Sequence, residues 1–146
     1  MIRAYALPAV RKAEAAALAE LDEGELMSRA ASGLAAVASA RLGGPGGRRV
    51  VAMVGAGNNG GDALYALASL ARDGATAVVL TVAGSVHEGG LQAAREAGAL
   101  VLDAVEGQAD SASAVSSTLR EADLVIDGIV GIGGHPGLSP RIEALL

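Results

Sequence analysis

The sequence predicts an α/β fold: a doubly wound parallel sheet between two layers of helices (α-β-α), preceded by N-terminal helices. Short apolar runs alternate with alanine-rich segments of helical periodicity, which is the pattern of parallel strands joined by crossover helices. The run Val50–Val54 contains no charged residue and indicates a central strand covered on both faces. A glycine-rich turn follows at 55–61, at the strand end where such sheets bind ligands.

Two helices are expected ahead of the sheet. Residues 8–21 repeat apolar side chains at helical spacing, and residues 25–42 do so again after an interruption at Gly24. The segment GGPGG at 43–47 is too rich in glycine for a regular element. It is therefore expected to be a linker between these helices and the first strand.

The core is expected to follow a β-α-β-α-β-α-β order. Its strands are predicted at about 49–54, 77–83, 99–102 and 123–127, and its helices at 62–73, 88–97 and 111–120. Right-handed crossovers then give the strand order 3-2-1-4, in which the first and fourth strands are neighbours. The loops that leave these two strands, 55–62 and 127–137, should therefore converge on one pocket.

The composition fits a single domain, 1–146, made of N-terminal helices and linker (1–47) and a core (48–146). Hydrophobic residues make up 51% of the chain, but with two Tyr and no Phe or Trp the core must be built from Ala, Val, Leu and Ile. The net charge of −5 disfavours nucleic acid as a partner. Without cysteine or an apolar run of membrane-spanning length, a cytoplasmic location with no membrane contact is expected.

A dinucleotide site is the first alternative. Gly55, Gly57 and Gly60 satisfy the fingerprint G-x-G-x-x-G between a strand and a helix. Two observations disfavour an NAD(P)-binding Rossmann oxidoreductase. The second strand ends without the acidic residue that would bind a ribose. Asp62 is expected in the first turn of the next helix, where its carboxylate would occupy the amides that a pyrophosphate needs.

Three segments resemble the NAD(P)H-hydrate epimerase family, the YjeF N-terminal domain. Residues 55–80, GAGNNGGDALYALASLARDGATAVVL, are similar to the family's GxGNNGGDG loop and its alanine-rich helix. Residues 123–138, DLVIDGIVGIGGHPGL, are similar to its DLVVDALFGTG loop, and Ala4–Ala31 resembles its N-terminal helices more weakly. Ala63 departs from the pattern, which commonly has Gly there, at little expected cost because a first helical turn accepts a Cβ. The resemblance implies a Rossmann-like core.

The resemblance also implies an activity, an isomerase that interconverts the R and S epimers of NADHX and NADPHX, hydrated at nicotinamide C6, for nucleotide repair. It implies a potassium ion as cofactor, held by Asn59 and Asp127, and a fused or separate dehydratase as partner. A homodimer is expected on the same ground. The implied substrate-binding residues are Asn58, Asn59, Gly60, Gly61 and Asp62 in the first loop, and Gly131, Ile132, Gly133, Gly134, His135, Pro136 and Gly137 in the second.

Asp127 is the candidate catalytic residue, because it ends an apolar strand at the rim of the sheet. A carboxylate there could shuttle a proton as the C6 hydroxyl leaves and returns through an iminium-like species. Asn59 and Asp127 also offer hard oxygens that suit a hard cation. The alternative for Asp127 is an Asx-type turn with Gly128, and for Asn58 and Asn59 a pair of turn-stabilising amides.

Several other features complete the prediction. The glycines of the second loop can offer backbone amides to phosphates, although Pro136 has no amide donor, and His135 is expected to contact solvent or phosphate. His87 is expected to begin a helix rather than bind a ligand. The family's DxPSG-type element is absent from these 146 residues, so the chain is expected to be C-terminally incomplete. A non-catalytic protein- or RNA-binding module of the same fold is the second alternative.

Overall fold

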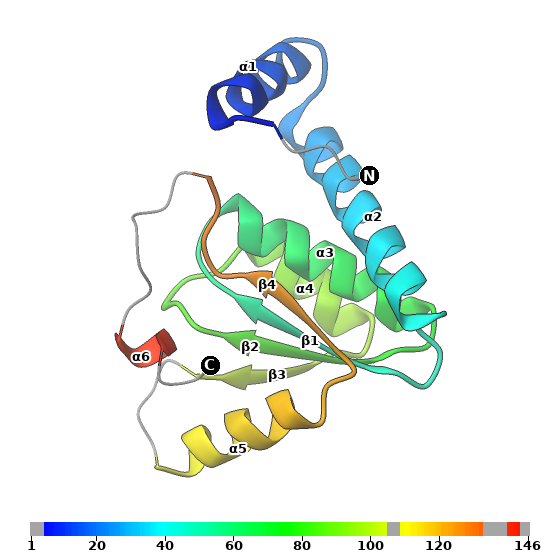
Figure 1. Cartoon of the computed structure of the whole chain (residues 1–146), viewed down its shortest axis with the longest axis vertical. Coiled ribbons are helices and arrows are strands. Elements are labelled where there is room, and N and C mark those ends of the chain that lie inside the picture. The colour runs from blue at the N-terminus through cyan, green and yellow to red at the C-terminus, as the bar shows by residue number, and fades with distance from the viewer. Residues whose placement is uncertain (1–4, 105–108, 133–139, 144–146) are drawn as a thin grey trace.

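The structure is a computed structural model that describes residues 5–104, 109–132 and 140–143. Its four strands are parallel and form one sheet in the order β3-β2-β1-β4 (Figure 1), which confirms the predicted order. The register pairs Val51 of β1 with Val78 of β2 on one side and with Val125 of β4 on the other. The strands are β1 (Arg49–Val54), β2 (Thr76–Thr81), β3 (Leu100–Asp103) and β4 (Leu124–Gly128).

Helices cover both faces of the sheet, so the predicted three-layer arrangement is confirmed. One face carries α2 (Glu23–Leu42), α3 (Asn58–Arg72) and α4 (Glu88–Glu96). The other face carries α5 (Ala109–Arg120) and the short α6 (Pro140–Glu143). The first helix, α1 (Leu7–Leu18), stands apart from these layers beyond the N-terminal end of α2 (Figure 1).

The core is aliphatic on both sides of β1, whose alternate residues point to opposite faces. Val50, Ala52 and Val54 pack with α3, whereas Val51 and Met53 pack with the helices of the opposite face. Small side chains let the helices approach one another closely: α2 buries alanines 31, 35 and 38 in the same cluster as α3. Alanine and the branched aliphatic residues therefore build the core, as the composition predicts.

The start of α3 differs from the prediction in a way that affects the site. The helix begins at Asn58, four residues before the predicted start, because the chain turns at Gly57 and enters the helix at once. Asp62 consequently lies beyond the first turn, which contains no acidic residue, and no side chain caps this helix. The expectation that Asp62 occupies the N-terminal amides of this helix is wrong. One of the two arguments against a dinucleotide-binding site is therefore removed.

Other element bounds shift for local reasons. Asp22 caps α2 by accepting a hydrogen bond from Glu25 N at 2.7 Å, so the helix begins at Glu23 and includes Gly24, which was expected to interrupt it. The first helix ends at Leu18, three residues earlier than predicted. Within the described ranges, no helix combines the length and the apolar character needed to cross a membrane.

Candidate functional site

The junction between β1 and α3 lies at the carboxyl end of the sheet. Gly55 N donates to Gly128 O at 3.0 Å, which extends the pairing of β1 with β4 past the end of β1. Gly57 has φ 84°, a left-handed conformation that favours glycine, and it is the N-cap of α3. Asn58 and Asn59 are therefore presented at the strand ends as the first residues of a helix rather than as loop residues.

Glycines let α3 pack directly on the strand ends. A Cβ on Gly55 would lie 2.0 Å from Ile129 O, and a Cβ on Gly60 would lie 2.4 Å from Gly55 O. A Cβ on Gly61 would lie 3.0 Å from the ring of His87. Both Gly60 and Gly61 are buried, and neither lines the cavity at this end of the sheet. The structure thus gives both a packing role, while their predicted contact with substrate stays a prediction.

The loop after β4 packs on α3 through Asn59. Asn59 Nδ2 donates to Val130 O at 3.2 Å, and a Cβ on Gly131 would lie 3.1 Å from Asn59 Cβ. The two loops that were predicted to converge are therefore in contact, as far as residue 132. The remaining predicted residues of this loop lie outside the described residues: Gly133, Gly134, His135, Pro136 and Gly137.

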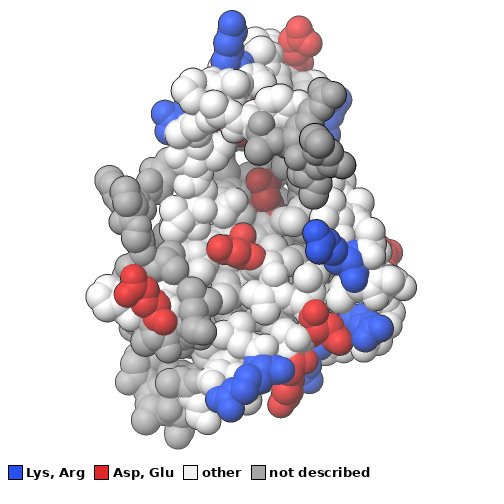
Figure 2. All heavy atoms as spheres, in the orientation of Figure 1, with Lys and Arg blue, Asp and Glu red and all other residues white. Residues whose placement is uncertain are grey.

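A cavity of about 930 Å³ adjoins this contact. Its volume is in the range of small-molecule sites. Five of the predicted substrate-binding residues line it, namely Asn58, Asn59, Asp62, Gly131 and Ile132. Figure 2 shows a hollow beneath α1, with acidic atoms inside it. The other lining residues come from α1, α2 and the strand ends: Arg11, Glu14, Leu18, Leu26, Met27, Ala30, Ala56, Gly57, Ile129 and Val130.

The lining residues on α1 and α2 were not predicted from the motifs. Arg11, Glu14 and Leu18 are spaced by three and four residues, so they share one face of α1. They lie within the Ala4–Ala31 segment whose resemblance is the weakest of the three. Helical spacing within that segment is the signal that could have found them.

Asp62 is half-buried in the wall of the cavity. Burial raises the pKa of its carboxyl above the usual range, and the negative charge of Glu14 raises this pKa further, while His87 lowers it. Burial and a like charge both favour the protonated carboxyl. A carboxyl with a perturbed pKa in a cavity is characteristic of functional sites.

Asp127, unlike Asp62, lies outside the lining of the cavity. Its Oδ1 accepts a hydrogen bond from Ile129 N at 2.9 Å, which closes the Asx-type turn through Gly128 of the alternative interpretation. A Cβ on Gly128 would meet Ala63 of α3, so the preceding side chain points to the opposite face of the sheet. Asp127 is exposed and does not line the cavity, whereas Asn59 does. The two predicted potassium ligands, Asn59 and Asp127, therefore do not line the same cavity in the described geometry.

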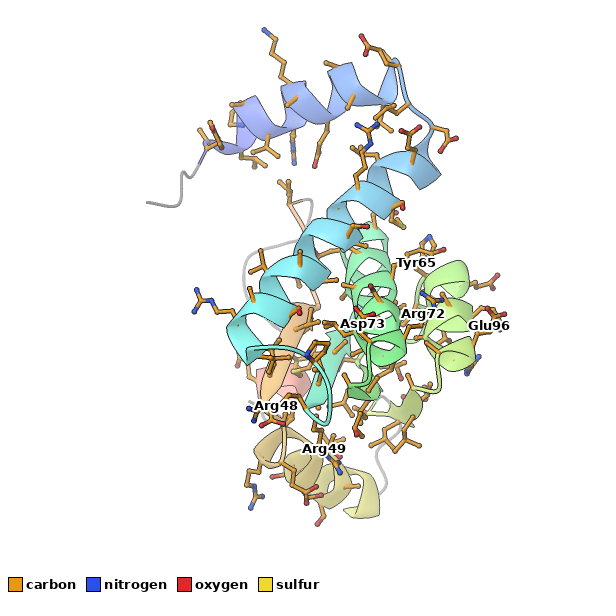
Figure 3. All side chains as sticks on the ribbon, turned by 90° about the vertical axis from the view of Figure 1, so that its right-hand side faces the viewer. Arg48, Arg49, Tyr65, Arg72, Asp73 and Glu96 are labelled. Carbon is orange, nitrogen blue, oxygen red and sulfur yellow. The ribbon has the colours of Figure 1, made fainter. Side chains whose placement is uncertain are left out.

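His87 begins α4, as predicted. It is the N-cap residue, and its Nδ1 accepts from Gly90 N at 3.0 Å. Its ring meets Tyr65 edge-on with centroids 5.7 Å apart. Both residues line a second cavity of about 590 Å³ together with Arg72, and Figure 3 shows Tyr65 and Arg72 on α3.

Fold and site together define an α/β domain with a cavity at the carboxyl ends of two adjacent parallel strands, β1 and β4, where such sheets bind ligands. Residues 23–146 match the family described as YjeF-related protein N-terminus. The chain belongs to this family, which confirms the membership predicted from the sequence.

Known proteins similar to this chain agree with that assignment. A protein of Mycobacterium leprae named bifunctional NAD(P)H-hydrate repair enzyme Nnr is 44% identical over 97% of this chain and 28% of its own length. A protein of Clavibacter sepedonicus named NAD(P)H-hydrate epimerase is 46% identical over 96% of this chain and 57% of its own length. The chain therefore spans between about a quarter and just over half of the length of these relatives. The crystal structure of yeast ynu0 shares the fold, with a TM-score of 0.77 and 17% identity over 99% of this chain and 63% of the yeast chain.

Proposed function

We propose that this chain is the epimerase domain of a nicotinamide nucleotide repair protein, an isomerase that interconverts the R and S epimers of NADHX and NADPHX. One observation carries the proposal: the two segments that resemble the family most closely meet at one cavity of about 930 Å³. The names of the relatives, NAD(P)H-hydrate epimerase and bifunctional repair enzyme, support this reaction.

The cavity contains groups that suit this chemistry. Epimerisation requires the hydroxyl on C6 of the hydrated ring to leave and to return on the opposite face, through a cation. Asp62 places a carboxyl group in the wall, and a carboxyl can transfer the proton and stabilise the cation. Asn58 and Asn59 offer amides to the nucleotide. Asp127 is the less supported catalytic candidate, because its side chain does not line the cavity.

Potassium is proposed as the cofactor, with Asn59 and Asp127 as its ligands. The donor chemistry fits, because amide and carboxylate oxygens are the hard donors that such a cation prefers. The geometry does not yet join them, because Asn59 lines the cavity and Asp127 points to the other face of the sheet. Asn59 turns its Nδ2 towards Val130 O, so its Oδ1 is directed elsewhere as an acceptor. A bound potassium ion would add positive charge at the carboxyl ends of β1 and β4, where it would suit the phosphates of a nucleotide.

The proposal extends to partners and location. The relatives named bifunctional support a dehydratase partner, fused or separate. The homodimer and the cytoplasmic location come from the resemblance and from the composition, and they stay predictions.

The activity can be tested with the complete protein that contains this chain. One purified epimer of NADHX is supplied, and its conversion to the other epimer is followed by chromatography against the uncatalysed rate. We expect a rapid approach to the epimer equilibrium. A folded protein that gives no acceleration with potassium present contradicts the proposal. In that case, RNA binding in a gel shift would favour the binding module. Tighter binding of NADH than of NADHX would favour the oxidoreductase.

The cation site is tested in the same assay with Asp127→Ala. The variant should lose activity and potassium dependence together while its far-UV circular dichroism is unchanged. Asp103→Ala is a matched control, because Asp103 is also an exposed carboxylate near the carboxyl end of a strand, on β3. Full activity of Asp127→Ala at low potassium would show that the proposed ligand set is wrong.

A further inference from the structure

The first helix lies against the cavity although it contributes nothing to the core. None of the residues of α1 is buried. Three residues on one of its faces, Arg11, Glu14 and Leu18, nevertheless line the cavity. Arg11 Nη2 also donates to Ile132 O at 3.4 Å, a long hydrogen bond that joins α1 to the loop after β4. The match to the family begins at residue 23 and therefore leaves this helix out.

The charges of the cavity are arranged unevenly. Its charged lining residues, within the described part of the chain, are Arg11, Glu14 and Asp62. Arg11 reaches the loop after β4, whereas Glu14 lies close enough to Asp62 to act on its charge. The other titratable group that acts on Asp62 is His87, which lies before α4. The cavity thus has a cationic group beside the second loop and a pair of carboxyl groups beside α3.

We propose that α1 completes the active site: Asp62 is the acid–base carboxyl, Glu14 is a second carboxylate in the same cavity that stabilises the cationic intermediate, and Arg11 binds the diphosphate of the substrate. This inference rests on the proposed function and adds two residues to it that lie outside the family match. The oriented charges give the substrate a direction, with the diphosphate towards the loop after β4 and the hydrated ring towards α3.

The reaction balances with these groups alone. The protonated carboxyl of Asp62 gives its proton to the C6 hydroxyl, the C–O bond breaks with its electrons on oxygen, and water leaves. The lone pair of the ring nitrogen forms the iminium bond to C6. Water then adds to the opposite face of C6, and its proton returns to the carboxylate. Nothing is oxidised or reduced, and the enzyme recovers its proton.

A pair of carboxyl groups suits this task better than a single one. Burial first, and the negative charge of Glu14 second, raise the pKa of the Asp62 carboxyl, so Asp62 keeps its proton to a higher pH than an isolated carboxyl would. The carboxylate of Glu14 stabilises the cationic intermediate.

The test uses the complete protein and the single-epimer assay. Glu14→Gln should lower kcat by about a hundredfold or more, the usual range for losing a group that stabilises charge in the transition state. The wild-type rate should fall as pH rises through the raised pKa of Asp62, and Glu14→Gln should shift that limb to lower pH. Arg11→Gln should instead raise KM by about tenfold with kcat retained, because a charge-assisted contact is lost.

Lys12→Gln is the matched control, because Lys12 is exposed on the same helix and does not line the cavity. It should keep wild-type kcat, KM and pH profile. An active wild type whose kcat and pH profile are unchanged by Glu14→Gln would overturn the role of Glu14 and leave the proposed function standing. Unchanged KM in Arg11→Gln would overturn the diphosphate assignment. A wild type without activity would overturn this inference and the proposed function together.

Discussion

A single methyl group distinguishes the packing of this chain from the family pattern. The pattern GxGNNGGDG has Gly where this chain has Ala63, and DLVVDALFGTG has Ala where it has Gly128. In the structure these positions face each other across the contact of α3 with β4, because a Cβ on Gly128 would lie 2.6 Å from Ala63 Cβ. The space holds one methyl group. The family pattern places it on the strand, and this chain places it on the helix.

A double-mutant cycle tests this exchange. Gly128→Ala should destabilise the protein by about 1–3 kcal/mol, as overpacking of a buried contact does. Ala63→Gly should cost about 1 kcal/mol, from helix propensity and a lost methyl group. The double variant should be more stable than Gly128→Ala alone, with a coupling energy of about 0.5–3 kcal/mol. Denaturant unfolding measures all four proteins, and simple additivity would contradict a shared methyl site.

Residue roles within a motif are harder to predict than the motif itself. The segment NNGGD lies at the cavity, but sequence alone cannot say which of its residues line that cavity. Asn58, Asn59 and Asp62 line the cavity, whereas Gly60 and Gly61 are buried against other parts of the chain. The reason is that the segment is helical from Asn58, so its side chains turn by about 100° per residue instead of following a loop.

At the scale of elements, the sheet was the most predictable part of the chain. Charge-free runs flanked by glycine identify strands, and the crossover rule leaves few orders for four parallel strands. Helix starts were less predictable, because caps decide them. Asp22 moves the start of α2 to Glu23, and Gly57 moves that of α3 to Asn58.

A polar cluster of Arg48, Arg49 and Asp123, here called the clip, joins β1 and β4 where both strands begin, at the end of the sheet opposite the site. Asp123 Oδ2 accepts from Arg49 N at 2.8 Å, and Asp123 N donates to Arg49 O at 2.9 Å. Arg48, labelled with Arg49 in Figure 3, adds an ion pair to Asp123 at 3.3 Å. The hydrogen bond from Arg49 N holds the pKa of the Asp123 carboxyl below its usual range, with help from Arg48.

The clip predicts a pH-dependent effect of Asp123→Asn. A folded-state pKa below the unfolded value contributes stability that is present above the unfolded pKa, and that is lost as pH falls through the folded pKa. The variant should therefore have a lower Tm than the wild type at pH 7, with a gap that closes as pH falls below about 4. Glu121→Gln is the control, because Glu121 pairs with Arg49 at 3.3 Å on the surface and should matter little at any pH. A gap that is constant with pH would contradict the clip.

At the scale of the whole molecule, fold and function rest on different parts of the chain. The sheet and its two helical layers contain the buried core, and the sequence predicted them from apolar periodicity. The cavity also needs α1, which has no buried residue. Its role was hard to predict, because hydrophobic patterns report burial, whereas Arg11 and Glu14 act through charge across a cavity.

Because the buried core lies outside α1 and the cavity includes it, the result of removing residues 1–18 from the complete protein can be predicted. The truncated protein keeps Asp22, the cap of α2, and every buried core residue of the described chain. We therefore expect cooperative unfolding with a Tm within a few degrees of the wild type, since less than about 1 kcal/mol of folding energy is lost. Epimerase activity should fall at least as far as in Glu14→Gln, because the truncation removes that carboxyl, Arg11 and one wall of the cavity together. Retained activity would show that α1 lies outside the working site, and a loss of cooperative unfolding would show that α1 supports the fold after all.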